Sequence, residues 1–368
     1  MKAQIKFVNQ DRSTFFPTLR KRVNEYFKEN EISRYGNREM YVKATVLISI
    51  YLLSYILILT LQVNAWLLLP FAVLMGLAKA GIGMGVMHDA LHGSYSKNTK
   101  LNKMMGDTIY MLGGNAFVWK IQHNIFHHTY TNIHGMDEDI NTKVVIRLSD
   151  QAPLKRYHRF QHIYVFFLYS LMTLLLLVND FIKILNYNRW GIVKQQRTTL
   201  DKEYTHMVAL KVVYLFFMIA LPILISSLLW WQVLIGFFAM HFTSGFILSV
   251  IFQMAHIVEG AHQPMPDTEG NIENAWAIHQ LETTANFSPD NRFLNWYIGG
   301  LNYQVEHHLF PNICHVHYPK LSKIVSETAR EFNLEYNVKP TFRSAIGSHV
   351  RMLRTLGTAQ SLPTAKAI

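Results

Sequence analysis

Four long apolar runs set the strongest limit on how this chain can fold. They lie at residues 44–63, 65–87, 212–229 and 232–255, and each is long enough to cross a hydrocarbon core of about 30 Å as a helix. The connectors inside the two pairs, residues 62–66 and Trp230-Trp231, are uncharged and aromatic, as expected of short turns on the outer side of a membrane. We therefore predict an all-α integral membrane protein with four transmembrane helices in two hairpins.

Composition limits the classes of molecule that this chain is expected to bind. Half of the residues are hydrophobic, and the formal net charge is +11. An excess of Lys and Arg is typical of cytoplasmic loops beside anionic lipid, and nucleic-acid binding is disfavoured because no basic stretch alternates with aromatic residues. The single cysteine, Cys314, excludes an intramolecular disulfide and a thiolate cluster for zinc or iron–sulfur. Any iron–sulfur electron carrier therefore has to be a separate partner.

The regions outside the spans are expected to lie in the cytoplasm. Residues 1–40 are basic and contain no apolar core of a signal peptide, so they form a cytoplasmic N-terminal segment. Residues 41–335 form the membrane domain, and residues 336–368 form a C-terminal tail. No further span is expected after His256, so the chain from there onward forms a cytoplasmic helical cap with a helix near 319–332.

A further apolar stretch, residues 163–178, lies between the two pairs of spans. Basic residues flank it on both sides, which places both of its ends in the cytoplasm. The metal ligands described below have to meet at one site, so the chain must cross the membrane an even number of times between them. We therefore expect this stretch to lie in the interface plane, or to form a shallow re-entrant hairpin.

Histidines cluster in three short boxes at metal-ligand spacing. Residues four apart on a helix lie about 5–6 Å apart at Cβ, so two such imidazoles face a common point. The boxes are His88 and His92, then His123, His127 and His128, then Gln304, His307 and His308. A tetrahedral ion takes fewer imidazoles than these boxes offer, so they predict a site for two metal ions. Imidazole suits zinc, copper and iron, so ligand type alone leaves the metal open.

One histidine outside the boxes is expected to act as a further ligand. His256 ends the last apolar run, at the same membrane depth as His88 at the end of the second run. His262 and His279 are its rivals, although a loop histidine without a metal role is the simpler interpretation of each. His315, His317 and several acids near the boxes are expected to orient the ligands from behind, although a solvated turn is the alternative for Asp137 and Asp139. These acids are Asp89, Asp137, Asp139, Glu282 and Glu306.

The boxes, in this order between paired apolar runs, resemble those of the integral-membrane fatty-acid desaturases. The likeness covers roughly residues 40–335. Gln304 stands where many members have a histidine, which is similar to the front-end subgroup, whose members insert a double bond between an existing one and the carboxyl end. The runs 299–311 and 314–319 are also similar to that subgroup. The chain lacks the His-Pro-Gly-Gly haem motif of a fused cytochrome b5, so it is most similar to stand-alone bacterial enzymes of the linoleoyl type.

The resemblance implies a diiron centre facing the cytoplasm in a multi-pass protein of a bacterial inner membrane, with both termini on that side. It implies two iron ions, O₂ as co-substrate, and electrons from an external ferredoxin or cytochrome b5 with its reductase. The substrate is expected to be a fatty acyl chain, as acyl-CoA or acyl-lipid, and the product a cis double bond. The implied ligands are His88, His92, His123, His127, His128, His256, Gln304, His307 and His308, with Gln304 binding directly or holding a water.

Two other functions fit the same residues. A site of this kind can place oxygen on carbon, which would make the chain an acyl hydroxylase. The histidines can also be structural or bind cargo in a zinc-binding membrane receptor or transporter. A zinc peptidase is disfavoured, because the first box reads His-Asp-Ala-Leu-His and lacks the glutamate of His-Glu-x-x-His.

Overall fold

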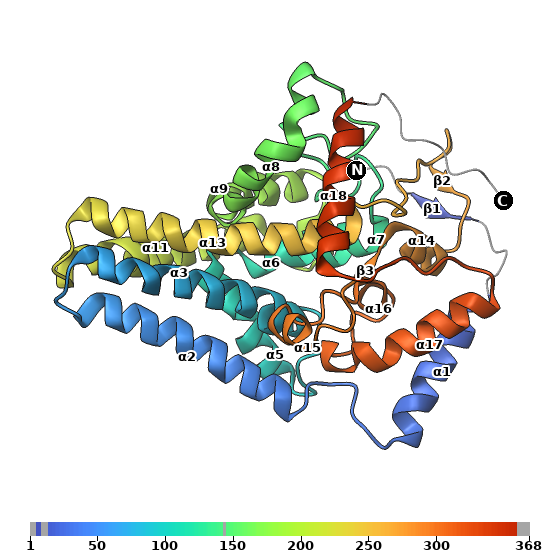
Figure 1. The fold of residues 1–368 in the computed structure, drawn as a ribbon, viewed down its shortest axis with the longest axis horizontal. Coiled ribbons are helices and arrows are strands. Elements are labelled where there is room, and N and C mark those ends of the chain that lie inside the picture. The colour runs from blue at the N-terminus through green and yellow to red at the C-terminus, as the bar shows by residue number, and fades with distance from the viewer. Residues whose placement is uncertain (1–4, 9–13, 143–144, 359–368) are drawn as a thin grey trace.

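The computed structural model describes residues 5–8, 14–142 and 145–358. Four helical segments within these residues are long and apolar enough to cross a membrane, which agrees with the predicted all-α membrane fold. The central one packs against α2 and α13, and Figure 1 shows the three side by side. The segments are α2 (Arg38–Thr60), the run of α3 (Ala65–Ile82), η1 (Gly83–Met87) and α4 (His88–Leu91), the run of α11 (Leu200–Leu215), η5 (Phe216–Ala220) and α12 (Leu221–Ile225), and α13 (Trp230–His256).

The third long segment begins at Leu200, well before the apolar run 212–229. Thr199 caps this start by accepting a hydrogen bond from the backbone N–H of Lys202 at 3.4 Å. Asp201 and Glu203 occupy the first turn, where the helix dipole favours carboxylates. These polar turns are helical without being apolar, so hydropathy alone places the helix start too late.

The stretch 163–178 does not form one unbroken helix. It is shared by α8 (Gln161–Ser170) and α9 (Met172–Arg189), which are bent by 77°. The last span stabilises the break, because Ser249 Oγ of α13 donates to the Tyr169 carbonyl at 3.2 Å. Gly245 of α13 also lies close to the Ser170 carbonyl, where a Cβ atom would be 2.5 Å from the oxygen. Such a bend fits either a broken span or a re-entrant hairpin, so the interfacial or re-entrant course of this stretch stays a prediction.

Many of the remaining helices form a cap around one end of the long segments (Figure 1). α1 (Phe15–Glu29) packs on α17 (Tyr318–Glu331), and Arg22 pairs with Glu331 at 2.7 Å. The helix predicted near 319–332 is therefore present. α18 (Phe342–Thr358), which belongs to the predicted tail, packs on α8 and α13. Other parts of the predicted N-terminal segment and tail, residues 1–4, 9–13 and 359–368, lie outside the described residues.

Short elements join these parts. Two small parallel pairs tie distant segments together: β1 (Lys6–Phe7) with β2 (Asn271–Ile272), and β3 (Asn286–Phe287) with β4 (Val338–Lys339). The short helices are α5 (Thr99–Gly106), η2 (Asp107–Leu112), α6 (Ala116–Trp119), η3 (Lys120–His127), α7 (His128–Tyr130), η4 (Arg156–Phe160), α10 (Ile192–Gln195), α14 (Trp276–Thr283), α15 (Arg292–Tyr297), α16 (Gln304–Leu309) and η6 (His315–His317).

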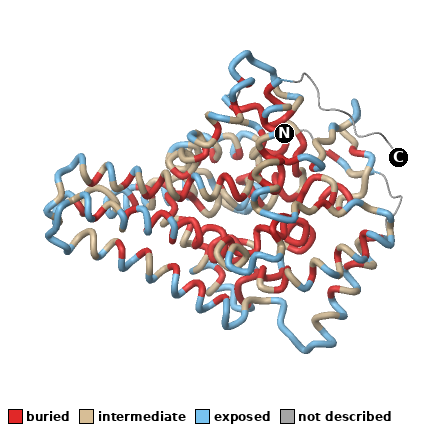
Figure 2. Tube along the Cα trace, in the orientation of Figure 1, coloured by how far each residue is buried: buried red, intermediate tan, exposed pale blue. Residues whose placement is uncertain are grey.

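Burial is concentrated where the long helices meet the cap. Figure 2 shows buried segments gathered there, whereas the far ends of the long helices carry many exposed positions. Gly299, with φ of +63°, permits a close approach: a Cβ atom on it would lie 2.5 Å from the Met84 carbonyl oxygen of η1. This contact brings the loop before the third histidine box against the end of the second span.

Candidate metal centre

The three histidine boxes meet in the buried zone between the long helices and the cap. Box 1 ends the second span at α4, His256 ends the last span, and box 3 lies on α16. Box 2 runs through η3, which is π-helical. A wider turn of this kind brings residues five apart into register, and His123 Nε2 lies 3.2 Å from His128 Nε2.

The imidazoles form two adjacent groups. In each group, ligand atoms from all members lie within 4.8 Å of one another. His128 lies between the groups, because it also clusters with His307 and His308 in the same sense. The first histidine group consists of His88, His92, His123 and His307, and the second histidine group consists of His127, His256 and His308.

The second histidine group has its ring tautomers fixed from behind. Each Nδ1 faces an oxygen that can only accept: Asp137 Oδ2 at 3.1 Å from His127, the Thr283 carbonyl at 3.4 Å from His256, and Gln280 Oε1 at 2.8 Å from His308. Each Nδ1 therefore carries the hydrogen and donates it. The lone pair is left on Nε2 in all three rings, which is the arrangement typical of metal-ligating histidine.

Several nitrogens that face the centre have no protein partner among the described residues. Among the described residues, buried ring nitrogens without a hydrogen bond include Nε2 of His92, His127, His256, His307 and His308. Leaving so many buried polar atoms unpaired is costly unless another group binds them. Neutral imidazole nitrogens that offer lone pairs in two adjacent groups fit a site for two transition-metal ions.

Electrostatics favour neutral rings at most of these positions. Burial lowers the pKa of His92, His123, His128, His307 and His308 well below the usual value, and neighbouring histidines lower it further. Burial also lowers the pKa of His127, but the carboxylates of Asp137 and Asp139 together outweigh it, so the net pKa is raised. Burial raises the pKa of Asp139 to about 6. A metal bound to His127 therefore competes with a proton.

The structure brings His256 and Gln304 to the centre. The His256 ring lies 4.7 Å from the His127 ring and 4.9 Å from the His308 ring, between centroids. Gln304 is buried, interacts with His256, and has an unpartnered Oε1. His262 and His279 belong to neither histidine group. The geometry thus favours His256 over its two rivals.

Known proteins are similar to this chain over most of its length. A family model for fatty acid desaturases matches residues 64–340. The sn-1 linoleoyl-lipid 6-desaturase of Synechocystis sp. is 36% identical over 346 residues, covering 94% of this chain and 96% of the relative. The enzyme of the same name from Arthrospira platensis is 33% identical, covering 96% of this chain and 95% of the relative. An acyl-lipid (8-3)-desaturase of Physcomitrium patens is 33% identical, covering 98% of this chain and 75% of the relative.

The chain belongs to the fatty acid desaturase family. This confirms the resemblance drawn from the histidine boxes. The desaturase is accordingly an oxidoreductase of lipid metabolism whose buried histidine cluster is compatible with a metal site.

The acids predicted to back the ligands divide into two sets. Asp137 and Asp139 of the desaturase do face His127, at 3.1 and 3.4 Å. Glu306 instead accepts hydrogen bonds from Asn286 and Tyr336 at 2.8 and 2.7 Å, and burial raises its pKa to about 7. Glu306 therefore links Asn286 and Tyr336 to the helix that carries the proposed ligand His307.

Several residues at the desaturase centre carried no usable sequence signal. Asn132 binds the carbonyls of His256, His262 and Thr283 through Nδ2, at 2.9, 3.1 and 3.2 Å. Gln280 positions His308 from α14. Two rings also lie against the ligands: Trp119 stacks on His123 with centroids 4.3 Å apart, and Phe252 lies 4.9 Å from the His127 ring. Neither asparagine nor glutamine at isolated positions differs from an ordinary loop or helix residue in the sequence.

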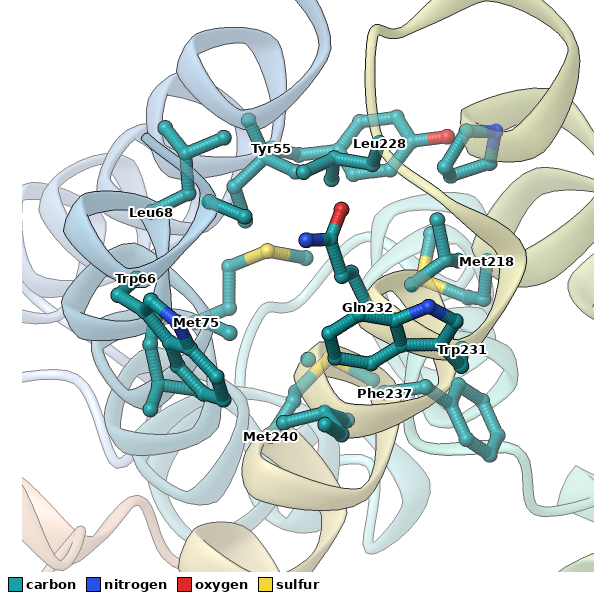
Figure 3. A pocket seen from close by; sticks show the side chains of 18 residues that line it. Tyr55, Trp66, Leu68, Met75, Met218, Leu228, Trp231, Gln232, Phe237 and Met240 are labelled. Atoms are coloured by element: carbon teal, nitrogen blue, oxygen red, sulfur yellow. The ribbon is translucent and has the colours of Figure 1, made fainter. Parts of the chain in front are cut away.

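An apolar cavity of about 60 Å³ lies at the other end of the long helices (Figure 3). Met75, Trp231 and Met240 line it, and the Gln232 amide points into it. Met75 precedes His88 by more than three helical turns, a distance of about 20 Å at 1.5 Å per residue. The cavity is therefore separate from the histidine groups.

Proposed function

We propose that the two histidine groups hold a diiron centre and that the protein is a front-end desaturase of membrane lipids. The observation that carries this proposal is the second histidine group, in which every Nδ1 donates to a fixed acceptor and every Nε2 is left free at the centre. The proposed ligands are His88, His92, His123, His127, His128, His256, His307 and His308, with Gln304 binding directly or holding a water.

In this proposal, the chain positions the metal ions and excludes water from the site. When bound, iron supplies with O₂ the oxidant that removal of hydrogen from an unactivated methylene requires. The imidazole nitrogens would hold the two metals, and Asp137, Thr283 and Gln280 keep three of the rings in the tautomer that binds metal. Trp119 and Phe252 cover part of the ligand set with apolar surface, which excludes water beside the reacting carbons.

The convergence of the boxes supports the proposed membrane topology. Box 2 and His256 lie together, and the two segments Leu200–Ile225 and Trp230–His256 lie between them in sequence. If both segments cross the membrane, the bent pair α8–α9 cannot also cross it, because three crossings would separate His127 from His256. We therefore propose two membrane hairpins, a re-entrant or interfacial α8–α9, and a cap that faces the cytoplasm with both termini.

The proposed substrate is a linoleoyl chain on a membrane lipid. By their names, the two cyanobacterial relatives are 6-desaturases of sn-1 linoleoyl lipids, and this chain aligns with nearly the whole length of each. A bond at position 6 lies on the carboxyl side of the existing ones, which agrees with the front-end type indicated by Gln304. A separate ferredoxin or cytochrome b5 supplies the electrons in this proposal.

Purified protein in lipid nanodiscs provides the test. We expect about two iron ions per chain, and O₂ uptake only when linoleoyl lipid and a reduced ferredoxin or cytochrome b5 are both supplied. The matched control is His308→Ala. His308 belongs to the second histidine group and also clusters with His128 and His307, so this variant removes a proposed ligand. A single zinc ion without O₂ uptake would favour the receptor or transporter, and a hydroxylated product would favour the hydroxylase.

A further inference from the structure

Three buried polar side chains from distant parts of the chain form a line behind the first histidine box. Lys43 of α2 places Nζ 2.5 Å from His315 Nε2. His315 of η6 places Nδ1 2.8 Å from Asp89 Oδ2, and its backbone N–H donates to the same oxygen at 3.2 Å. All three residues are almost fully buried.

The direction of these hydrogen bonds follows from the two ends of the line. A lysine ammonium can only donate, so His315 Nε2 accepts from Lys43. His315 then carries its ring hydrogen on Nδ1 and donates it to Asp89. A neutral imidazole thus joins a cation to a carboxylate, and the line has no net charge when both ends are ionised.

Asp89 connects the line to a proposed metal ligand. Its other oxygen, Oδ1, lies 3.8 Å from Nδ1 of His88, and that nitrogen has no hydrogen bond of its own. His88 Nε2 faces the centre, 3.2 Å from His123 Nε2. The Asp89 carboxylate therefore lies on the Nδ1 side of His88, beyond hydrogen-bond distance, and its negative charge favours a hydrogen on Nδ1 and the lone pair on the inward-facing Nε2.

The fold makes room for this line. Lys43 passes beside Gly85, where a Cβ atom would lie 3.3 Å from Lys43 Cδ, and its ammonium lies 5.7 Å from the Trp296 ring centroid. The side chains of Asp89, Cys314 and His315 have the spacing of a metal site. A third metal is nevertheless disfavoured there, because the Lys43 ammonium already lies against His315 Nε2.

We propose that Lys43 and His315 are positioning residues that act through Asp89 on His88, and so set the affinity of one of the two metal positions. The inference rests on the proposed diiron centre. Lys43 orients the His315 ring, His315 fixes the Asp89 carboxylate with two donors, and Asp89 holds His88 in the tautomer that binds metal. Loss of a partner behind a metal-ligating histidine typically lowers metal affinity about 10–100-fold.

The test is a chelator titration of Lys43→Met in the full-length, iron-loaded protein. The iron content per chain is measured by elemental mass spectrometry after dialysis against increasing concentrations of chelator. Mössbauer spectra report the two iron environments separately. The matched control is Lys79→Met, because Lys79 is an equally buried lysine of the spans whose partners are Tyr214 and His241, not the line to His88. Lys43→Arg tests rescue by a retained cation.

We expect Lys43→Met to lose one iron at a chelator concentration about tenfold lower than wild type, and to change only one of the two Mössbauer signals. Lys79→Met should retain both irons, and Lys43→Arg should recover most of the wild-type affinity. His315→Gln, a second variant for the case that Lys43→Met does not fold, should reproduce its loss. If Lys43→Met and His315→Gln both keep the iron affinity and the spectra of the wild type, the inference is overturned and the proposed function stands. A wild-type protein that does not bind two irons would overturn the proposed function on which the inference rests.

Discussion

Asn132 fastens the end of the last long helix to the second histidine box: its Nδ2 donates to the carbonyl of His256 at 2.9 Å. Its backbone N–H donates to Asp137 Oδ2 at 2.9 Å, and that carboxylate in turn holds His127. One residue thus sets the relative position of two proposed ligands that lie far apart in sequence.

Asn132→Ala should destabilise the protein and weaken the second histidine group. It removes the side-chain donor of the His256 and His262 carbonyls, a buried unpaired carbonyl costs about 1–3 kcal/mol, and it places alanine at a φ of +58°. We expect a lower midpoint of thermal unfolding and fewer metal ions per chain. Asn132→Gly separates the two effects, because it tolerates the backbone and lacks only the side chain. Wild-type stability in both variants would refute this role.

Asp137→Asn should lower metal affinity at the second histidine group by about tenfold or more, because an amide is a weaker acceptor for His127 Nδ1 than a carboxylate. Chelator titration of the iron-loaded protein measures the change. Asp107→Asn, which removes a surface partner of Lys103, is the matched control and should bind metal like wild type. Equal affinity in the two variants would show that Asp137 does not support the ligand.

Gly299→Ala should separate the first and third boxes. The added Cβ would overlap the Met84 carbonyl at 2.5 Å, and the backbone at φ of +63° disfavours any side chain. We expect a large loss of both thermal stability and bound metal. Gly236→Ala of α13 provides the contrast, since its Cβ would meet only Ala72 at 3.8 Å and helix propensity favours alanine. The prediction fails if both glycine variants melt and bind metal alike.

His349 should make stability depend on pH through α18. Its Nδ1 donates to the Ile257 carbonyl at 2.7 Å, its Nε2 accepts from the Tyr169 hydroxyl at 3.0 Å, and burial lowers its pKa to about 4. The folded state therefore binds fewer protons than the unfolded state below a pH of about 6.5. The stabilisation is fully present above that pH and is lost as the pH falls toward 4. Thermal melts should show a smaller acid-induced decrease for His349→Gln than for wild type; equal pH profiles would contradict this.

The sequence contains the local parts of this centre. Spacing alone picks out the box histidines, and the end of the last apolar run picks out His256, because both signals are periodic or positional within one segment. Residues that act across segments were not predictable. Lys43 on a membrane helix gives no sign that it meets His315, and Asn132 gives no sign that it reaches three carbonyls. The bend between α8 and α9 depends on Gly245 and Ser249 of α13, so hydropathy of the bent stretch itself cannot reveal it.

Product analysis tests the central claim most directly. Fatty acids from a host that expresses the chain and is fed linoleate are analysed by gas chromatography–mass spectrometry, beside a host that expresses His307→Ala. The account predicts a new acid with one more double bond, located on the carboxyl side of the existing ones and absent from the variant. A hydroxy acid, or no new product even when ferredoxin and its reductase are co-expressed, would contradict it.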